Sequence, residues 1–245
     1  MQRALMGVLT PSSNTILEPA TSALVADLDG VSAHFSRFTV TRIALGDAAN
    51  SQFEYAPMLG AARLLADARV GVIAWSGTSA SWLGATWDSE LCAVITRETG
   101  IPACTAVGAI NQLIDHAGGR RIGLVSPYTS DVQDKIIANY AAGGIEVVTQ
   151  AHAGLSENFA FSELSEGAVS QMCREVARGK PDAIVLMCTN MVGWRFMARL
   201  EAELEIPIID STAAVVWKAL AMLDVPLSPL AHRGWMFSQG PEQGR

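Results

Sequence analysis

The chain has 245 residues, of which 50% are hydrophobic and only 17% are charged, and its mean hydropathy is +0.27. This composition is typical of a compact folded protein and excludes disorder. The 24 acidic residues outnumber the 17 basic ones and there is no basic run, so we expect no nucleic-acid partner.

No segment is typical of a membrane anchor or a leader. The longest uncharged stretch, 70–87, is interrupted by glycine, serine and threonine, so we expect no membrane partner. The apolar run after Arg3 is shorter than the core of a signal peptide. The four cysteines lack CxxC spacing, which favours free thiols and a cytoplasmic location.

Apolar runs bounded by Gly, Pro or Ser alternate with helix-length amphipathic segments, the pattern of a parallel sheet covered on both faces. The predicted strands are 4–10, 70–76, 101–105, 121–126, 145–149, 182–188 and 206–210. The predicted helices are 15–28, 54–68, 83–99, 106–117, 130–142, 162–179, 192–204 and 212–223. The stretch 30–50 is ambiguous between strand and loop.

The second half of the chain repeats motifs of the first half in the same order. The matching pairs are Gly7-Val-Leu-Thr-Pro11 with Gly123-Leu-Val-Ser-Pro127, 72–77 with 184–188, and Gly100-Ile-Pro102 with Glu205-Ile-Pro207. A duplicated unit explains these matches, although recurring Val/Ile/Leu strands and Gly turns make any βαβ protein similar to itself.

The duplication predicts an α/β fold of two pseudo-symmetric Rossmann-like (flavodoxin-like) halves with parallel sheets. The halves are 1–117 and 118–240, and the C-terminal segment 206–240 is a candidate to pack onto the first half. Ligands in open α/β sheets bind beyond the carboxyl ends of the strands, so we expect the active site in the cleft between the halves.

Four loops that follow predicted strands should converge in this cleft, and they carry neutral donors rather than charges. The loops are 11–14, 77–79, 127–129 and 188–190, with hydroxyls, amides, a thiol and a phenol but no carboxylate or histidine. The four histidines are dispersed, so we expect no metal. GxGxxG, GxxxxGK[ST] and GxSxG are absent, which gives no support for a nucleotide cofactor or a hydrolase elbow.

Cys188 is the candidate acid or base of this cleft. It ends the apolar run 183–187 and precedes a helix predicted near residue 192. Backbone dipoles at a helix N-terminus would favour its thiolate and make it usable near neutral pH. The alternative is a buried structural cysteine, which we expect for Cys92, Cys104 and Cys173.

The loop Gly77-Thr78-Ser79 supplies hydroxyl and amide donors at the equivalent strand end of the first half. Such a loop binds a carboxylate or a developing oxyanion, although an ordinary helix cap before Trp82 explains it equally. Tyr128 and the cluster at 12–14 add neutral donors. Together they describe a site for an anionic substrate.

With these motifs, the chain resembles the aspartate/glutamate racemase superfamily, and within it the branch of arylmalonate decarboxylase and maleate cis-trans isomerase. The resemblance runs from Gly7 to about Leu223. Racemases of this superfamily carry one cysteine in each half, and Gly77 stands where the first would be. The loss resembles arylmalonate decarboxylases, which keep the second-half cysteine and a Gly-Thr-Ser loop.

The resemblance implies a reaction without a cofactor. It implies that Thr78, Ser79 and Tyr128, with backbone amides near Cys188 and Thr189, bind the carboxylate that stays and the enediolate formed when CO2 leaves. Cys188 would then protonate one face.

The loop at the first strand end resembles a different branch. The run Pro11-Ser12-Ser13-Asn14-Thr15 is similar to that of maleate isomerases, whose asparagine contacts a substrate carboxylate. The resemblance therefore adds Pro11, Ser12 and Asn14 to the substrate-binding residues. Thr189-Asn190 replaces the glycine-rich pair that follows the cysteine in decarboxylases.

We expect a cofactor-independent decarboxylase of a substituted malonate or a similar small dicarboxylate. One alternative is an isomerase or racemase of the maleate, Asp/Glu or hydantoin type, in which Cys188 works with a second base. Another is a non-catalytic protein that binds small acids in the same cleft. The sequence leaves the natural substrate and a homo-oligomer open.

Overall fold

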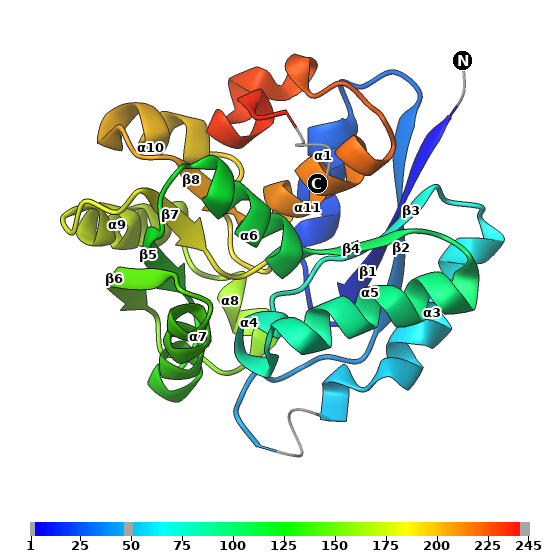
Figure 1. Ribbon diagram of the computed structural model, residues 1–245, viewed down its shortest axis with the longest axis horizontal. Coiled ribbons are helices and arrows are strands. Elements are labelled where there is room, and N and C mark those ends of the chain that lie inside the picture. The colour runs from blue at the N-terminus through cyan, green and yellow to red at the C-terminus, as the bar shows by residue number, and fades with distance from the viewer. Residues whose placement is uncertain (1–2, 47–50, 241–245) are drawn as a thin grey trace.

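The computed structural model describes residues 3–46 and 51–240, which form two four-stranded parallel sheets with helices packed on them (Figure 1). The strand order is β2-β1-β3-β4 in the first sheet and β6-β5-β7-β8 in the second. The predicted α/β fold of two similar halves is therefore confirmed.

The elements of the first half are β1 (Ala4–Pro11), α1 (Leu17–Val25), β2 (Val31–Phe38), η1 (Ser51–Phe53), α3 (Tyr55–Asp67), β3 (Val72–Trp75), α4 (Ala80–Leu83), α5 (Ala85–Thr99), β4 (Ala103–Thr105) and α6 (Ala106–His116). Those of the second half are β5 (Arg121–Ser126), α7 (Ser130–Ala142), β6 (Glu146–His152), α8 (Asn158–Phe161), α9 (Glu166–Ala177), β7 (Ala183–Leu186), α10 (Met197–Leu204), β8 (Ile208–Asp210), α11 (Ser211–Met222), η2 (Ser228–Arg233) and η3 (Trp235–Ser238).

The backbone hydrogen bonds of the two halves follow the motif matches found in the sequence. Ile73 N donates to Pro102 O in the first half, and Ile184 N donates to Pro207 O in the second. Just beyond the central strands, Ser76 N donates to Leu9 O and Met187 N donates to Val125 O. Gly77 and Cys188 each lie two residues after the end of their strand, β3 and β7. They are therefore equivalent positions.

The C-terminal helix joins the halves. Its strand, β8, pairs with β7 in the second sheet, whereas α11 packs against α1, α6, β3 and β4 of the first half (Figure 1). All but three residues of α11 are buried. The chain thus crosses between the halves at β8, and the boundary predicted at 117/118 stays a prediction.

Several element boundaries differ from those that we expected, each for a local reason. The ambiguous stretch 30–50 contains β2, an edge strand, and its residues 47–50 lie outside the described part. The predicted helix 83–99 is divided at Gly84, whose φ of +112° few other residues adopt.

The helix predicted at 192–204 begins only at Met197, which changes the surroundings of Cys188. In the irregular turn before it, Gly193 packs closely on the sheet, where an added Cβ would lie 2.3 Å from Asp210 Oδ2 and 2.5 Å from Leu186 Cδ1. Our expectation that Cys188 faces a helix N-terminus is therefore wrong.

Thr105, the last residue of β4, forms buried hydrogen bonds, and replacing it tests how much these bonds stabilise the fold. Its hydroxyl donates to Asp88 Oδ2 at 2.5 Å and accepts from Gly108 N at 3.0 Å, and Asp88 Oδ1 has no partner. We expect Thr105→Val to lower the free energy of unfolding by about 2–3 kcal/mol, because a cap and the last side-chain partner of a buried carboxyl are lost together.

Denaturant unfolding of Thr105→Val measures this loss. Ser89→Ala, which removes an exposed hydroxyl bonded to Thr86 O on the neighbouring helix α5, is the control and should change stability by less than about 0.5 kcal/mol. Equal effects of the two variants would contradict the importance of the buried pair.

Candidate active site

A small cavity lies where the carboxyl ends of the central strands of both sheets meet. Its volume is about 20 Å³, which is little more than a single water molecule needs. The lining residues are Pro11, Val40, Ile43, Phe53, Trp75, Gly77, Thr78, Ser79, Trp82, Tyr128, Asn158, Cys188 and Thr189. The structure therefore leaves little free space at this point between the halves.

The predicted site residues converge on this cavity, except Ser12 and Asn14. Ser12 lies off the cavity wall, where its Oγ accepts from Val40 N at 3.1 Å. Asn14 lies behind Thr189: its Oδ1 accepts from the backbone N–H groups of Ile16 and Leu17, and its Nδ2 donates to Thr189 Oγ1 at 3.3 Å. Both hold loops in place, and their substrate contacts stay predictions.

Cys188 is a fully buried, neutral thiol. Burial raises its pKa to about 12, although hydrogen bonds from Tyr128 and from the Asn190 N–H favour the thiolate. The Asn190 N–H lies 3.4 Å from Sγ. Desolvation outweighs these donors, so our expectation of a thiolate favoured near neutral pH is wrong. Such a thiol is suited to donating a proton rather than to abstracting one.

Tyr128 joins the thiol to the donor loop of the other half. Its hydroxyl lies 2.7 Å from Thr78 Oγ1, where either group can donate, and it is also hydrogen-bonded to Cys188. Burial and the nearby Cys188 raise the pKa of Tyr128 well above its usual value. The phenol therefore keeps its proton and remains available as a donor to an oxyanion.

Buried polar groups bind the two strand-end loops directly to one another. Thr189 Oγ1 donates to Ser76 O at 3.0 Å, across the cavity floor from one half to the other. Asn190 Oδ1 accepts from Thr15 N at 3.0 Å, and its Nδ2 donates to Asn158 O at 2.5 Å. The bonds to Ser76 and Thr15 cross between the halves and hold the loop after β7 against the loops of the first half, whereas the bond to Asn158 ties Asn190 to its own half.

An apolar wall, which the sequence did not reveal, faces the polar donors. It is formed by Val40, Ile43, Phe53, Trp75 and Trp82. Val40 and Ile43 belong to the stretch whose structure was ambiguous, and Phe53 comes from η1. Trp75 and Trp82 lie on either side of the loop 77–79 in the sequence. This closeness was the one sequence feature that could have marked them as site residues. The cavity is thus polar on one side and apolar on the other.

Asp210 is a buried carboxyl near the thiol that we did not single out from the sequence. Its Oδ1 caps α11 by accepting from Ala213 N at 2.8 Å, and its Oδ2 has no partner. Burial raises the pKa of Asp210 to about 7, and its charge contributes to the raised pKa of Cys188. It is part of what keeps the thiol neutral.

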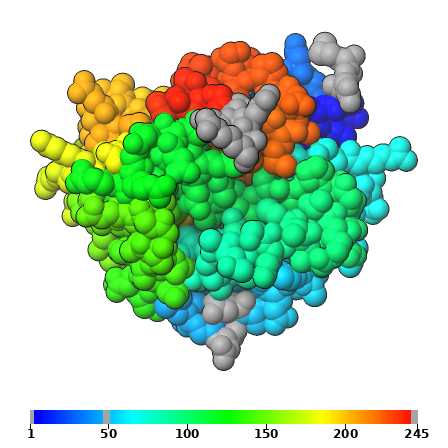
Figure 2. Space-filling model, viewed as in Figure 1, coloured from blue at the N-terminus to red at the C-terminus, as the bar shows by residue number. Residues whose placement is uncertain are grey.

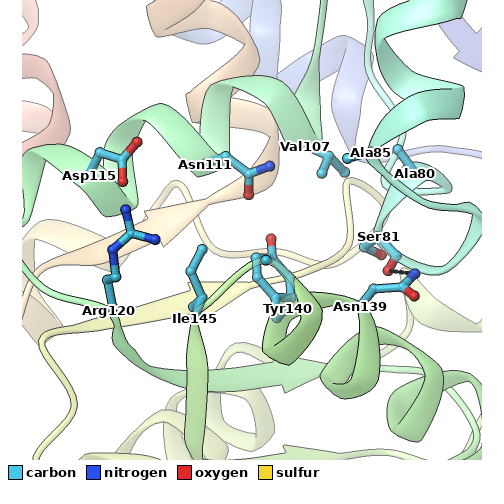
Figure 3. A pocket seen from close by; sticks show the side chains of 11 residues that line it. Ala80, Ser81, Ala85, Val107, Asn111, Asp115, Arg120, Asn139, Tyr140 and Ile145 are labelled. Atoms are coloured by element: carbon cyan, nitrogen blue, oxygen red, sulfur yellow. Dashed lines mark hydrogen bonds between the residues drawn. The ribbon is translucent and has the colours of Figure 1, made fainter.

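A larger cavity, of about 260 Å³, lies on the other side of α4, between α6 and α7 (Figure 3). Its lining residues include Asn111, Asp115, Arg120 and Tyr140. In Figure 2, α4, α6 and α7 meet around a hollow on the viewed face. It contains none of the converging strand-end donors and no thiol, so the smaller cavity is the candidate active site.

In residues 3–46 and 51–240, no three His, Cys, Asp or Glu side chains are grouped as metal ligands would be. No helix in this part of the chain has the length and apolar character needed to cross a bilayer.

A family model described as arylmalonate decarboxylase matches residues 14–234. The chain belongs to the arylmalonate decarboxylase family. It is 23% identical to arylmalonate decarboxylase of Bordetella bronchiseptica, with 87% of this chain and 90% of the relative covered. It is also 23% identical to maleate isomerase of Geobacillus stearothermophilus, with 90% and 92% covered. The predicted resemblance to both branches is confirmed, and both are enzymes.

Solved structures of both branches share the fold. Maleate isomerase of Nocardia farcinica with a covalently bound succinylcysteine intermediate has a TM-score of 0.87 at 20% identity, covering 97% of this chain and 98% of that one. A liganded double mutant of arylmalonate decarboxylase, with one glycine changed to cysteine and one cysteine to serine, has a TM-score of 0.79 at 18% identity, covering 91% and 93%.

The raised pKa of Cys188 has a direct consequence for labelling. In the native protein at about pH 8.5, where an ordinary thiol is half ionised, we expect iodoacetamide to label Cys188 at least tenfold more slowly than in the unfolded chain, since only the thiolate reacts. Mass spectrometry of the peptide containing Cys188 measures both rates. Equal rates would contradict a buried neutral thiol.

Proposed function

We propose that the protein is a cofactor-independent decarboxylase of a substituted malonate or a similar small dicarboxylate. The proposal rests on one asymmetry: Cys188 is a protonated thiol on the cavity wall, and the equivalent position of the other half is Gly77. Among the described residues that line the cavity, Cys188 is the one thiol. One acid and no opposing base suit protonation of a carbanion on a single face.

The donors around the cavity account for the loss of CO2. One carboxylate of the substrate binds to the hydroxyls of Thr78, Ser79 and Tyr128. When the bond from the α-carbon to the other carboxylate breaks, its electron pair forms an enediolate on the first. These donors are preorganised and buried, so they stabilise the charge that develops there.

Cys188 completes the reaction. Its S–H proton passes to the α-carbon, the enediolate becomes a monocarboxylate, and water returns a proton to the thiolate. The raised pKa of Cys188 keeps the thiol protonated before this step, and the transfer proceeds because the α-carbon of the enediolate is a far stronger base than the thiolate. The apolar wall receives the α-substituent and keeps water from the leaving carboxylate.

An isomerase of a small dicarboxylate is the second candidate. It is favoured by the higher TM-scores of the maleate isomerase structures and by Asn14 in the first loop. A panel of α-substituted malonates, maleate and hydantoins distinguishes the two functions. Release of CO2 from a malonate supports the decarboxylase, and isomerisation without CO2 release refutes it.

Removing the thiol tests the acid. We expect Cys188→Ala to lower kcat by about 10²–10⁴-fold while the protein stays folded, because positioned general acids contribute that much. Circular dichroism and thermal unfolding check the fold, and CO2 release measures the rate. Cys173→Ala, at a buried cysteine outside the cavity, is the control. Wild-type turnover by Cys188→Ala would exclude the assignment.

Removing a donor tests the oxyanion site. We expect Ser79→Ala and Thr78→Val to lower kcat by about 10–10³-fold with a smaller change in KM, since their hydroxyls meet charge that is largest in the transition state. Steady-state kinetics on the best malonate of the panel measures both constants. A change confined to KM would make these residues substrate anchors instead.

The single acid predicts the stereochemistry of the product. One thiol delivers a proton to one face, so the reaction in D2O should give one enantiomer with one deuterium at the α-carbon. Chiral chromatography with mass spectrometry measures both properties. A racemic product from an α-carbon that does not exchange afterwards would contradict protonation by Cys188 alone.

A further inference from the structure

We propose that Trp75 determines substrate specificity at this site and positions Ser79. Its indole occupies the space beside Gly77, limits the size of the α-substituent that fits there, and directs the Ser79 hydroxyl by an N–H bond. The substrate class in this proposal rests on the proposed function. The packing of Trp75 against Gly77 and Ser79 does not depend on it.

The indole of Trp75 covers the α-carbon of Gly77. A Cβ built on Gly77 would lie 2.1 Å from Trp75 Cζ2 and 2.5 Å from both Cε2 and Cη2. Real Cβ atoms do not approach other atoms so closely, and here three atoms of the six-membered ring are in the way. Residue 77 is therefore a glycine because its neighbour fills the place of its side chain.

Trp75 has no free space to move into. It is the last residue of β3 and pairs with Leu9 on one side and Thr105 on the other. Its side chain is 1% exposed, and its ring lies against Phe38 with 5.1 Å between the centroids. Nε1 lies 3.3 Å from Ser79 Oγ. The ring is thus held on three sides while its remaining surface faces the cavity.

The corresponding strand of the second half ends differently. β7 ends on Leu186, and two residues later the chain carries the side chain of Cys188. The side chain that lines the cavity thus comes from the last strand residue, Trp75, in the first half. In the second half it comes from Cys188, two residues beyond the strand. The Trp75–Gly77 pair, and not the glycine alone, makes the two sides of the cavity unlike.

This arrangement places a flat apolar surface at the Gly77 end of the cavity. A substituent on the reacting carbon that points toward Gly77 meets the indole before it meets backbone. Because the indole occupies this end of a cavity of only about 20 Å³, a larger substituent there would have to displace the ring. We therefore expect substrates with small α-substituents to be preferred.

The N–H of the indole gives Trp75 its second role. Because Ser79 Oγ accepts from Trp75 Nε1, the hydroxyl proton of Ser79 points elsewhere and is free to bind the substrate carboxylate. Trp75 does not touch the developing charge through this bond, so it acts here as a positioning residue.

An unfolding experiment tests the packing without any substrate. Gly77→Ala is made in the wild type and in Trp75→Leu, and thermal midpoints are compared. We expect a clear fall of the midpoint in the wild type and little or no fall in Trp75→Leu, because leucine leaves room for the new Cβ. Gly60→Ala, in α3 where nothing lies within 4 Å of the added Cβ, is the control. The same fall in both backgrounds would refute the contact.

A kinetic experiment separates the two roles. Wild type, Trp75→Leu and Trp75→Phe are assayed on a series of α-alkylmalonates from methyl to pentyl. We expect Trp75→Leu to raise the kcat/KM ratio of the larger to the smaller substrates at least tenfold. Trp75→Phe should leave that ratio within threefold but lower kcat more than it changes KM, because the ring remains and the N–H is lost. Trp235→Leu, at a half-buried tryptophan outside the cavity, should change neither.

The outcomes distinguish a failure of this inference from a failure of the proposed function. Active wild type with an unchanged size ratio in Trp75→Leu overturns the specificity role, and an unchanged kcat in Trp75→Phe overturns the positioning role. If the wild type releases no CO2 from any malonate, the proposed function fails. In that case calorimetric binding of the same series decides the specificity role, which requires the same tenfold change in the ratio of Kd values.

Discussion

The candidate site depends on the rule that polar groups removed from water need hydrogen-bond partners. The strand ends of both halves are buried against each other, and several of their donors and acceptors pair across the cleft. Thr189 Oγ1 donates to Ser76 O, and Tyr128 pairs with Thr78. Separation of the halves would leave these groups without partners unless water entered, so opening for substrate and hydration of the site are a single event.

The same burial sets the chemistry of the thiol. A cysteine in water ionises near pH 8.5, and one beside a helix N-terminus does so lower still. No helix begins directly after Cys188, and burial raises its pKa to about 12, with a smaller contribution from the charge of Asp210. The thiol therefore stays protonated near neutral pH, and only a strong base such as a carbanion takes its proton. Burial therefore favours an acid at this position over the base that a two-cysteine racemase needs.

The sequence was sufficient to predict the two-half α/β fold and the donor loops, because Gly, Pro and Ser residues mark the strand ends. Gly7-to-Pro11 matched Gly123-to-Pro127, and the hydrogen bonds of the two sheets follow that match. It did not reveal contacts between segments distant in the chain. The apolar wall comes partly from η1 and the stretch after β2, and α10 begins only after a turn in which Gly193 packs against Asp210. Propensity carries no signal for such tertiary contacts.

A duplicated fold provides two equivalent positions for chemistry, and differences between them decide what the site can do. At Cys188 the protein places a thiol, whereas at Gly77 it places a backbone position covered by an indole. Placing a side chain at residue 77 would not by itself make the two sides of the cavity alike, because the indole of Trp75 occupies the space that this side chain would need. Any change in the number of acids in this cleft must first change a residue of the strand. The direction of proton delivery is thus tied to packing in β3.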